Sequence, residues 1–324
     1  MLSAYDKGQQ KNTQMLPGII SNDPAMHRLA AQVRKIAPSD RPVLLNGDTG
    51  TGKELFANAI HVLSNSTGAL VPVNCSAIPE SLFESLLFGH EKGAFTGADK
   101  RHHGFFAQAN GGTLFFDEVA ELPLIHQAKL LRVLESKKFT RIGSDEQIVF
   151  TGRIVSATHV NMKQRVKDKL FREDLFYRFN LFELTIPSLE ERKDDIPLLV
   201  NKFAQQEPVI IFSQCALDFF KYSQWPGNIR QLKNTIDKIS VLAESDYLSA
   251  DCIRALAVCE QEQDLMGKLA RDIIGMPKGN KIKDICDALV QQAVTLSQGN
   301  KTEAAKLLGV HRKVVERRLC QIRS

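Results

Sequence analysis

The stretch Gly47-Asp48-Thr49-Gly50-Thr51-Gly52-Lys53-Glu54 decides the fold of this chain of 324 residues. It matches the pattern G-x-x-x-x-G-K, in which glycines let backbone N–H groups point at phosphate oxygens and the lysine supplies a positive charge. An apolar run at 43–45 precedes the loop, and a helical pattern at 55–63 follows it. A strand, a loop and a helix in this order predict a site that holds nucleotide phosphates at a helix N-terminus.

Two acidic residues, Asp117 and Glu118, follow the apolar run at 113–116. At the carboxyl end of a strand beside a phosphate loop, Asp117 would hold Mg²⁺ through water and Glu118 would polarise the attacking water. Glu54 stands where a Ser or Thr ligand of Mg²⁺ is usual. We therefore expect the metal to depend on other groups, on Thr51 or on water.

Polar residues also follow the apolar runs at 71–73 and 153–157. Asn74 follows the first run, where its amide could hold Glu118 out of position until nucleotide is bound. Thr158 follows the second run and could sense the γ-phosphate in the same way. Both residues are therefore candidates for the nucleotide site.

Two arginines, Arg172 and Arg178, lie six residues apart in a charged segment. An arginine finger from a neighbouring subunit stabilises phosphoryl transfer, so this pair is a candidate for that role. A surface salt-bridge cluster with Glu173 and Asp174 is the alternative, and spacing alone favours it.

A third arginine, Arg230, follows a turn that Pro226 and Gly227 impose. Asn228 is a candidate cap for the helix that begins there, and Arg230 lies in the first turn of that helix. It could reach the phosphates from a helical subdomain; ordinary surface charge is the alternative.

Short apolar runs alternate with helical patterns from residue 18 to 187, which predicts a parallel α/β sheet with helices on both faces. The expected strands are 43–45, 71–73, 113–116, 153–157 and 181–186. Residues 188–259 lack such runs and are expected to form a helical subdomain. The remaining expectations are a polar leader at 1–17, a connector at 260–280 and a helical unit at 281–324.

Composition excludes several classes of protein. Hydrophobic residues make up 43% and charged residues 24% of the chain, which is ordinary for a globular protein. The sequence has no apolar run of the roughly 20 residues that a membrane span needs, and no signal-peptide core. Six cysteines without C-x-x-C spacing indicate free thiols in a reducing cytoplasm, not a zinc site or a disulfide framework.

The C-terminal unit has the pattern of a helix-turn-helix. Asn300 is expected to cap a short helix with Glu303 as its capping-box partner, and Gly309 ends that helix. From Lys278 onward the sequence contains ten Lys or Arg residues and four Asp or Glu residues. The resulting surplus of six positive charges exceeds the net charge of +5 of the whole chain. A basic excess on one small unit is typical of DNA binding, and a solvated helix face is the alternative.

The segment 89–98 interrupts a helical pattern with small residues around one phenylalanine. Gly93 and Gly97 are expected to form a hairpin tip that presents Phe95 to a partner. A phenylalanine buried in a tight turn is the equally weighted alternative.

With these motifs the sequence resembles the sigma-54-dependent transcription activators, which are bacterial enhancer-binding proteins of the AAA+ class. The segment Gly93-Ala94-Phe95-Thr96-Gly97-Ala98 is close to diagnostic for them. The resemblance covers about residues 18–258 and the C-terminal unit. It implies an AAA+ P-loop parallel sheet with a helical lid, followed by an all-α helix-turn-helix domain of the Fis type. A glutamate at the position of Glu54 in the phosphate loop also resembles the pattern of this family.

The resemblance also implies roles for individual residues. The segment 93–98 would contact sigma-54, and Asn74 would act as the switch for Glu118. Arg172 and Arg178 look like fingers that act across subunits, and Arg230 like a second nucleotide sensor. The residues that match DNA-facing positions of the Fis-type domain are His311, Arg312, Arg317 and Arg318.

From the resemblance we expect an ATP-driven activator, with Mg²⁺, that binds enhancer DNA and remodels sigma-54 RNA polymerase holoenzyme to the open complex. It implies a ring, typically a hexamer, of this chain alone or with a related chain, in the cytoplasm. Because only a short leader precedes the ATPase, the chain resembles the one-piece subgroup without an N-terminal receiver, controlled by a separate protein.

This sequence departs from the family where Leu86 and Ala107 replace usual glutamates, where Glu190 replaces a common arginine, and where Gln231 replaces a usual glutamate. Leu86 and Ala107 keep open a second hypothesis, that of a repressor or anti-activator that binds nucleotide and DNA without productive remodelling. A third, an AAA+ unfoldase or replication ATPase, is disfavoured by the segment 93–98.

Overall fold

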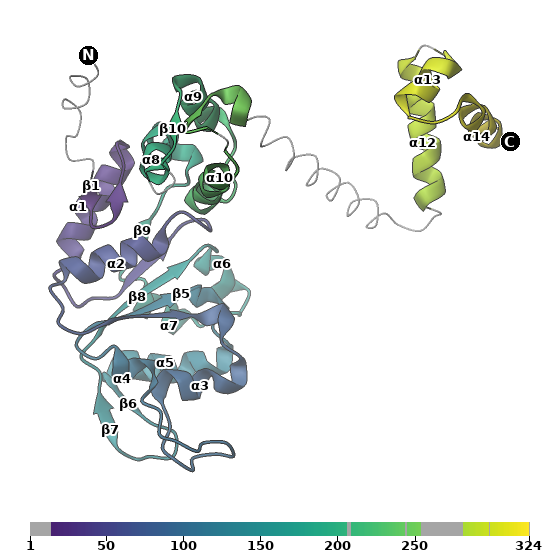
Figure 1. Cartoon of the computed structure of the whole chain (residues 1–324). Coiled ribbons are helices and arrows are strands. Elements are labelled where there is room, and N and C mark those ends of the chain that lie inside the picture. The colour runs from purple at the N-terminus through teal and green to yellow at the C-terminus, as the bar shows by residue number, and fades with distance from the viewer. Residues whose placement is uncertain (1–13, 206–208, 244, 254–280, 298, 324) are drawn as a thin grey trace, which may run out of the picture. The chain divides into compact units, whose positions relative to one another are not determined.

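The computed structural model describes residues 14–205, 209–243, 245–253, 281–297 and 299–323. The chain divides into two compact units, Met1–Ile253 and Arg254–Ser324, and each is described by itself (Figure 1). The predicted connector at 260–280 lies outside the described residues.

A five-stranded sheet forms the centre of the first unit, and all of its strand pairs are parallel. In order across the sheet, the strands are β4 (Leu70–Asn74), β5 (Thr113–Asp117), β8 (Arg153–Thr158), β3 (Val43–Asn46) and β9 (Phe182–Thr185). The parallel α/β sheet predicted from five apolar runs is therefore confirmed, with strand bounds that differ by one residue or two.

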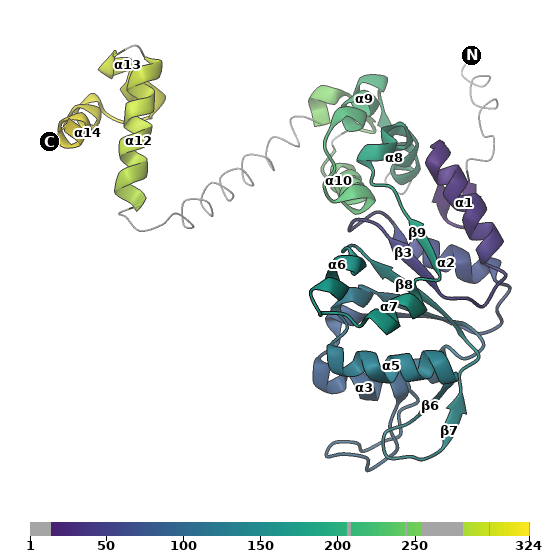
Figure 2. The ribbon, with the colours of Figure 1, turned by 180° about the vertical axis from the view of Figure 1, so that it is seen from behind.

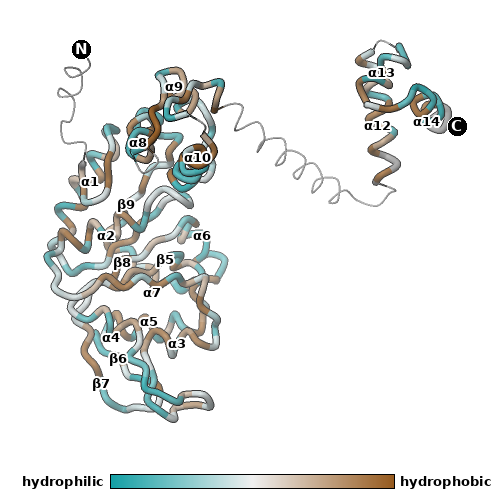
Figure 3. The backbone as a smooth tube through the Cα atoms, viewed as in Figure 1, coloured by the Kyte–Doolittle hydropathy of each residue, from teal (hydrophilic) through white to brown (hydrophobic). Residues whose placement is uncertain are grey.

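Helices cover both faces of this sheet (Figure 2). Side chains alternate between the faces of a strand, so Val43 and Leu45 enter one core and Leu44 enters the other. The first core lies under α1 (Pro24–Ile36) and α2 (Lys53–Leu63), and the second under α3 (Glu80–Phe88), α5 (Leu124–Ser136) and α7 (Glu173–Phe179). Hydrophobic segments accordingly gather in the sheet and in the helix faces against it (Figure 3).

The start of the described chain differs from the expected leader. Residues Gln14–Leu16 form β1, which pairs with β2 (Ile19–Ile20) across a turn at Gly18, where φ is 78°. Met15 and Leu16 are buried with the apolar side of α1, so residues 14–17 belong to the folded unit. Two buried side chains in a polar stretch were too few to reveal this hairpin.

The helical subdomain consists of α8 (Ile196–Ala204), α9 (Gln214–Tyr222) and α10 (Asn228–Leu242), preceded by the 3₁₀ helix η3 (Glu190–Asp195). It also contains two strands of two residues each, β10 (Ile211–Phe212) and β11 (Tyr247–Leu248), which pair in parallel. The expectation of a purely helical subdomain is therefore wrong in this detail.

The remaining elements of the first unit are short. They comprise η1 (Cys75–Ala77), α4 (Gly104–Gln108), η2 (Val119–Glu121), α6 (Met162–Lys167) and the antiparallel strands β6 (Lys138–Thr140) and β7 (Gln147–Val149). None of the helices in the described part of the chain combines the length and apolar character that crossing a membrane requires.

The described part of the second unit, residues 281–297 and 299–323, has three helices: α12 (Lys281–Leu296), α13 (Lys301–Leu307) and α14 (Arg312–Arg323). Asn300 caps α13 by accepting hydrogen bonds from Thr302 N and Glu303 N, as its position predicts. A small core holds the three helices together, and it consists of Val290, Ala293, Ala304, Ala305 and Val315. A short helix, a turn at Gly309 with φ of 63° and a second helix complete the predicted helix-turn-helix.

Candidate active site

The sheet order brings the predicted nucleotide residues together. Strand β8 lies between β5 and β3, so the carboxyl ends of these three strands are neighbours. The phosphate loop follows β3, Asp117 and Glu118 lie at the end of β5, and Thr158 ends β8. Ligands of parallel α/β sheets bind beyond this edge, which makes it the candidate active site.

The phosphate loop has the backbone conformation that its glycines permit. Gly50 and Gly52 have φ values of 80° and 100°, in the left-handed region that side chains rarely adopt. A Cβ atom on Gly50 would lie 2.3 Å from the carbonyl oxygen of Gly227, in the turn before α10. The loop therefore leaves no room for a side chain where it meets the helical subdomain.

Lys53 begins α2 and is buried, with 7% of its surface exposed. Its Nζ donates to the carbonyl oxygens of Gly47 and Asp48, at 2.8 and 3.4 Å, and lies 3.8 Å from Glu118 Oε1. Burial lowers the pKa of this ammonium group, and the negative charge of Glu118 opposes that shift. A buried ammonium inside a glycine loop fits the phosphates of a nucleotide.

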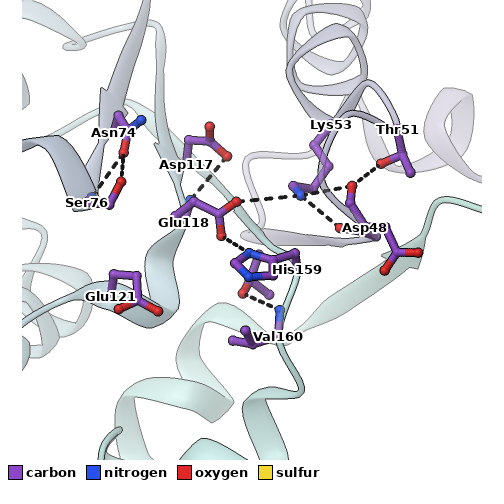
Figure 4. A network of polar contacts seen from close by, with 12 residues as sticks. Asp48, Thr51, Lys53, Asn74, Ser76, Asp117, Glu118, Glu121, His159 and Val160 are labelled. Atoms are coloured by element: carbon purple, nitrogen blue, oxygen red, sulfur yellow. Dashed lines mark hydrogen bonds and ion pairs between the residues drawn. The ribbon is translucent and has the colours of Figure 1, made fainter. Parts of the chain in front are cut away.

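Asp117 and Glu118 lie across from the phosphate loop, and the Glu118 carboxylate is directed toward Lys53 (Figure 4). Burial, and then the negative charge of Glu118, raises the pKa of the Asp117 carboxyl. A partly buried carboxylate beside a second acid fits Mg²⁺, which one or two carboxylates usually hold together with water and substrate phosphates. Asp117 is the residue that would hold the metal.

Glu118 has a backbone conformation that is unusual for a residue with a side chain. Its φ is 53°, in the left-handed region, where a non-glycine residue costs about 1–3 kcal/mol and often marks a functional site. The turn directs the carboxylate between Lys53 and His159, whose Nδ1 lies 2.6 Å from Glu118 Oε2 (Figure 4). Sequence reasoning missed His159, although its position directly after Thr158 was a usable signal.

Asn74 lies beside the acid pair, and its role as a switch for Glu118 stays a prediction. It pairs in register with Asp117, but its side-chain oxygen accepts hydrogen bonds from Ser76 N and Ser76 Oγ, at 3.0 and 2.7 Å. Among the described residues it is His159, not Asn74, that bonds to the Glu118 carboxylate. The Asn74 side-chain oxygen caps η1, because an Asn at this position readily bonds to the backbone two residues on.

Thr158 is fully buried at the edge of the site. Its hydroxyl accepts a hydrogen bond from Val160 N at 3.2 Å, and its carbonyl accepts one from Gly47 N at 3.2 Å. The backbone of this residue is therefore tied to the start of the phosphate loop, while its role as a phosphate sensor stays a prediction.

Asn228 connects the helical subdomain to the phosphate loop. Its Oδ1 accepts from Leu189 N at 2.7 Å, and its Nδ2 donates to Thr49 O at 3.1 Å. The expectation that Asn228 caps α10 is wrong, because Gly227 occupies the cap position and Asn228 is the first helical residue. Its side chain serves a contact between distant segments, which local sequence does not reveal.

Arg230 lies in the first turn of α10, as predicted, and its N–H donates to Gly50 O at 3.3 Å. Its guanidinium is exposed, and its positive charge contributes to the lowered pKa of Lys53. Two positive groups that repel each other across a loop favour an anion between them.

An apolar cavity of about 100 Å³ adjoins the phosphate loop, and sequence reasoning missed it. Buried Arg192 lies at this cavity and donates to Thr51 O at 3.2 Å, which ties η3 to the loop. The side chains that make the wall apolar are Ile19, Ile20, Met26, Leu55, Phe56, Leu199, Phe203 and Ile229. The cavity has the chemistry to receive the flat, apolar face of a base.

The two predicted finger arginines are exposed at either end of α7. Arg172 makes a bidentate pair with Asp174, at 3.0 and 2.7 Å. Within the described residues, neither Arg172 nor Arg178 bonds to Lys53 or Glu118. In a single subunit, Arg172 therefore forms the surface salt bridge with Asp174 that was the alternative interpretation. A role for either arginine across subunits stays a prediction.

The segment 93–98 forms a tight turn closed by a hydrogen bond from Gly93 N to Ala98 O at 2.8 Å. Phe95 and Thr96 are exposed, and 41% of the Phe95 surface is accessible. The Phe95 ring meets the ring of His90 edge to face, with centroids 5.0 Å apart. An exposed ring at a turn matches the expected contact loop and not the alternative of a buried phenylalanine.

The predicted DNA-facing residues differ in their surroundings. His311, Arg312 and Arg317 are exposed, and Arg312 bonds to Glu316 at 2.9 Å on the same helix. Arg318 is half-buried and bonds to Asp287 of α12 at 3.2 Å, so it holds two helices together. The structure thus gives Arg318 a packing contact, and its role toward DNA stays a prediction.

The family follows from comparison with known proteins. Residues 19–185 match the sigma-54 interaction domain, 190–266 the AAA+ ATPase lid domain, and 287–321 the Fis family of bacterial regulatory proteins. The chain belongs to the family of sigma-54-dependent transcriptional regulators. Its AAA+ sheet, helical lid and helix-turn-helix are therefore the parts of a DNA-binding transcription regulator.

Several relatives resemble most of this chain. The transcriptional regulatory protein ZraR of Salmonella typhimurium is 41% identical over 308 residues, which are 92% of this chain and 67% of ZraR. The regulatory protein AtoC of Escherichia coli is 39% identical over 312 residues, 92% of this chain and 66% of AtoC. The crystal structure of NtrX from Brucella abortus in complex with ATP matches with a TM-score of 0.71 and 29% identity, covering 94% of this chain and 68% of NtrX.

Proposed function

We propose that this chain hydrolyses ATP and uses the energy to remodel sigma-54 RNA polymerase holoenzyme to the open complex, while its C-terminal unit binds enhancer DNA. The observation that carries the proposal is the meeting of Lys53, Asp117 and Glu118 at one sheet edge. The same unit displays Phe95 and Thr96 on an exposed turn. One unit thus carries both the candidate site for ATP hydrolysis and the candidate surface for contact with sigma-54.

In this proposal the loop 47–54 and Lys53 hold the phosphates of ATP, and the base enters the apolar cavity beside the loop. Asp117 would hold Mg²⁺, whose charge offsets that of the phosphates. Glu118 accepts a hydrogen bond from the attacking water, and Thr158 and Arg230 respond to the phosphates.

Assembly completes the proposed site. Arg172 and Arg178 lie on the surface, as a finger offered to a neighbouring subunit requires. The chain would accordingly form a homo-hexameric ring, and a separate regulatory protein would control its activity. The segment 93–98 contacts sigma-54, and His311, Arg312, Arg317 and Arg318 form the candidate DNA surface.

Transcription in vitro from a sigma-54 promoter tests the proposal directly. Open complexes should form with ATP and not with ADP, and Glu118→Gln should bind ATP without supporting them. A chain that binds nucleotide and enhancer DNA but opens no promoter would instead favour the repressor or anti-activator.

A further inference from the structure

We propose that His159 is a positioning residue that orients the Glu118 carboxylate toward the attacking water. The inference rests on the proposed ATP hydrolysis and adds to it a residue outside the predicted site. His159 directly follows β8, whose neighbour β5 carries Glu118. The two side chains point toward each other across the strand ends (Figure 4).

The contact distinguishes the two oxygens of Glu118. Oε2 lies 2.6 Å from His159 Nδ1, and Oε1 lies on the side of Lys53, at 3.8 Å from its Nζ. An ionised carboxylate only accepts hydrogen bonds, so Nδ1 is the donor. Charge-assisted bonds of this kind are short and directional, which fixes the plane of the carboxylate. Oε1 is then the oxygen that faces the phosphate side of the site.

His159 is well placed for this task because its backbone is fixed. It follows Thr158, which is fully buried and whose carbonyl accepts from Gly47 N. The side-chain oxygen of Asn74, the other polar residue near the acids, accepts hydrogen bonds from Ser76. A glutamate side chain has three rotatable bonds, and among the described residues the contacts that restrain the Glu118 carboxylate are the short one to His159 and the longer one to Lys53.

The test compares His159→Ala with His159→Asn. We expect His159→Ala to lower kcat by about ten- to a hundredfold, because small displacements of a reacting group have effects of this size. The dissociation constant for ATP should stay within about twofold, since Lys53 and the loop are untouched. An Asn amide can donate from nearly the place of Nδ1, so His159→Asn should restore most of the lost turnover.

Two controls separate positioning from folding. His27→Ala removes an exposed histidine of α1, away from the site, and should change nothing. If His159 acts only through Glu118, adding His159→Ala to Glu118→Gln should cause no further loss of turnover.

A second readout needs no activity. In wild-type protein, ring ¹⁵N NMR should show His159 with the proton on Nδ1, and Glu118→Ala should remove that preference. The same ring state in both proteins would overturn the contact.

The outcomes also separate this inference from the proposed function. Wild-type protein that does not hydrolyse ATP would overturn the proposed function, whatever the ring shows. Wild-type turnover that His159→Ala leaves unchanged or increases would overturn only the role of His159.

Discussion

The candidate active site at the sheet edge and the contact loop at 93–98 differ in how far their side chains are exposed to solvent. At the nucleotide edge, Lys53 and Glu118 are largely buried and are held by other groups of the same chain. At the contact loop, Phe95 and Thr96 face solvent, and the turn is closed by backbone bonds alone. Chemistry requires groups that are placed in advance, whereas contact with a partner requires surface left uncovered. Substitutions in the two regions should therefore separate hydrolysis from output.

The largest effect is expected at Lys53. Lys53→Ala removes the buried positive charge of the phosphate loop, so nucleotide binding and hydrolysis should both be lost. Binding of a fluorescent ATP analogue measures the first and phosphate release the second. Retained tight binding would mean that the backbone loop alone holds the phosphates.

The next largest effect is expected at the finger arginines. Arg178→Ala should lower turnover by up to about a thousandfold if the guanidinium stabilises the transferring phosphoryl group. Mixing this variant with Lys53→Ala should restore part of the activity, because one intact interface can form between the two mutants. Absence of rescue in assembled rings would place Arg178 in its own subunit's structure.

Thr96→Ala should separate the two regions most sharply. The residue is exposed on the contact turn, and within the described residues no hydrogen bond joins it to Lys53, Asp117 or Glu118. ATP hydrolysis should stay within about twofold, while sigma-54 binding and open-complex formation disappear. A joint fall in hydrolysis and transcription would show that the turn supports the active site.

The smallest effect is expected in the second unit. Arg317 is exposed on α14, and Arg317→Ala should weaken enhancer binding several-fold without altering ATP hydrolysis. If Arg317 meets a phosphate, the slope of log affinity against log salt should fall by about 1. An unchanged affinity at all salt concentrations would remove Arg317 from the DNA surface.

The parts of the fold that the sequence predicted are those with long or repeated signals. Five apolar runs predicted the five central strands, and Asn300 marked the start of α13. The misses are two-residue strands such as β10 and β11, which exist because the surrounding fold brings them together. Segments this short carry too few residues for a pattern to form.

The same distinction applies to the site. The phosphate loop and the acid pair were predictable because their spacing along the chain is fixed by the chemistry. The contacts of Asn228 and His159 were harder to predict, since each joins residues far apart in sequence: Asn228 reaches Thr49, and His159 reaches Glu118. Such contacts depend on how the fold brings distant segments together, which the sequence alone left open; the position of His159 directly after Thr158 was the one local signal.

The close approach of the phosphate loop to the turn before α10 has a mechanical consequence. Gly50 touches Gly227 so closely that no methyl group fits between them, and Asn228 bonds to the same loop. Helix α10 starts at this contact and runs for 15 residues, a length of about 22 Å. A tilt of about 10° at its base would carry its far end, with exposed Val241 and Leu242, through about 4 Å. A helix anchored in this way has the geometry of a lever arm, in which a small rotation at the phosphate loop would become a displacement of several ångströms at the far end.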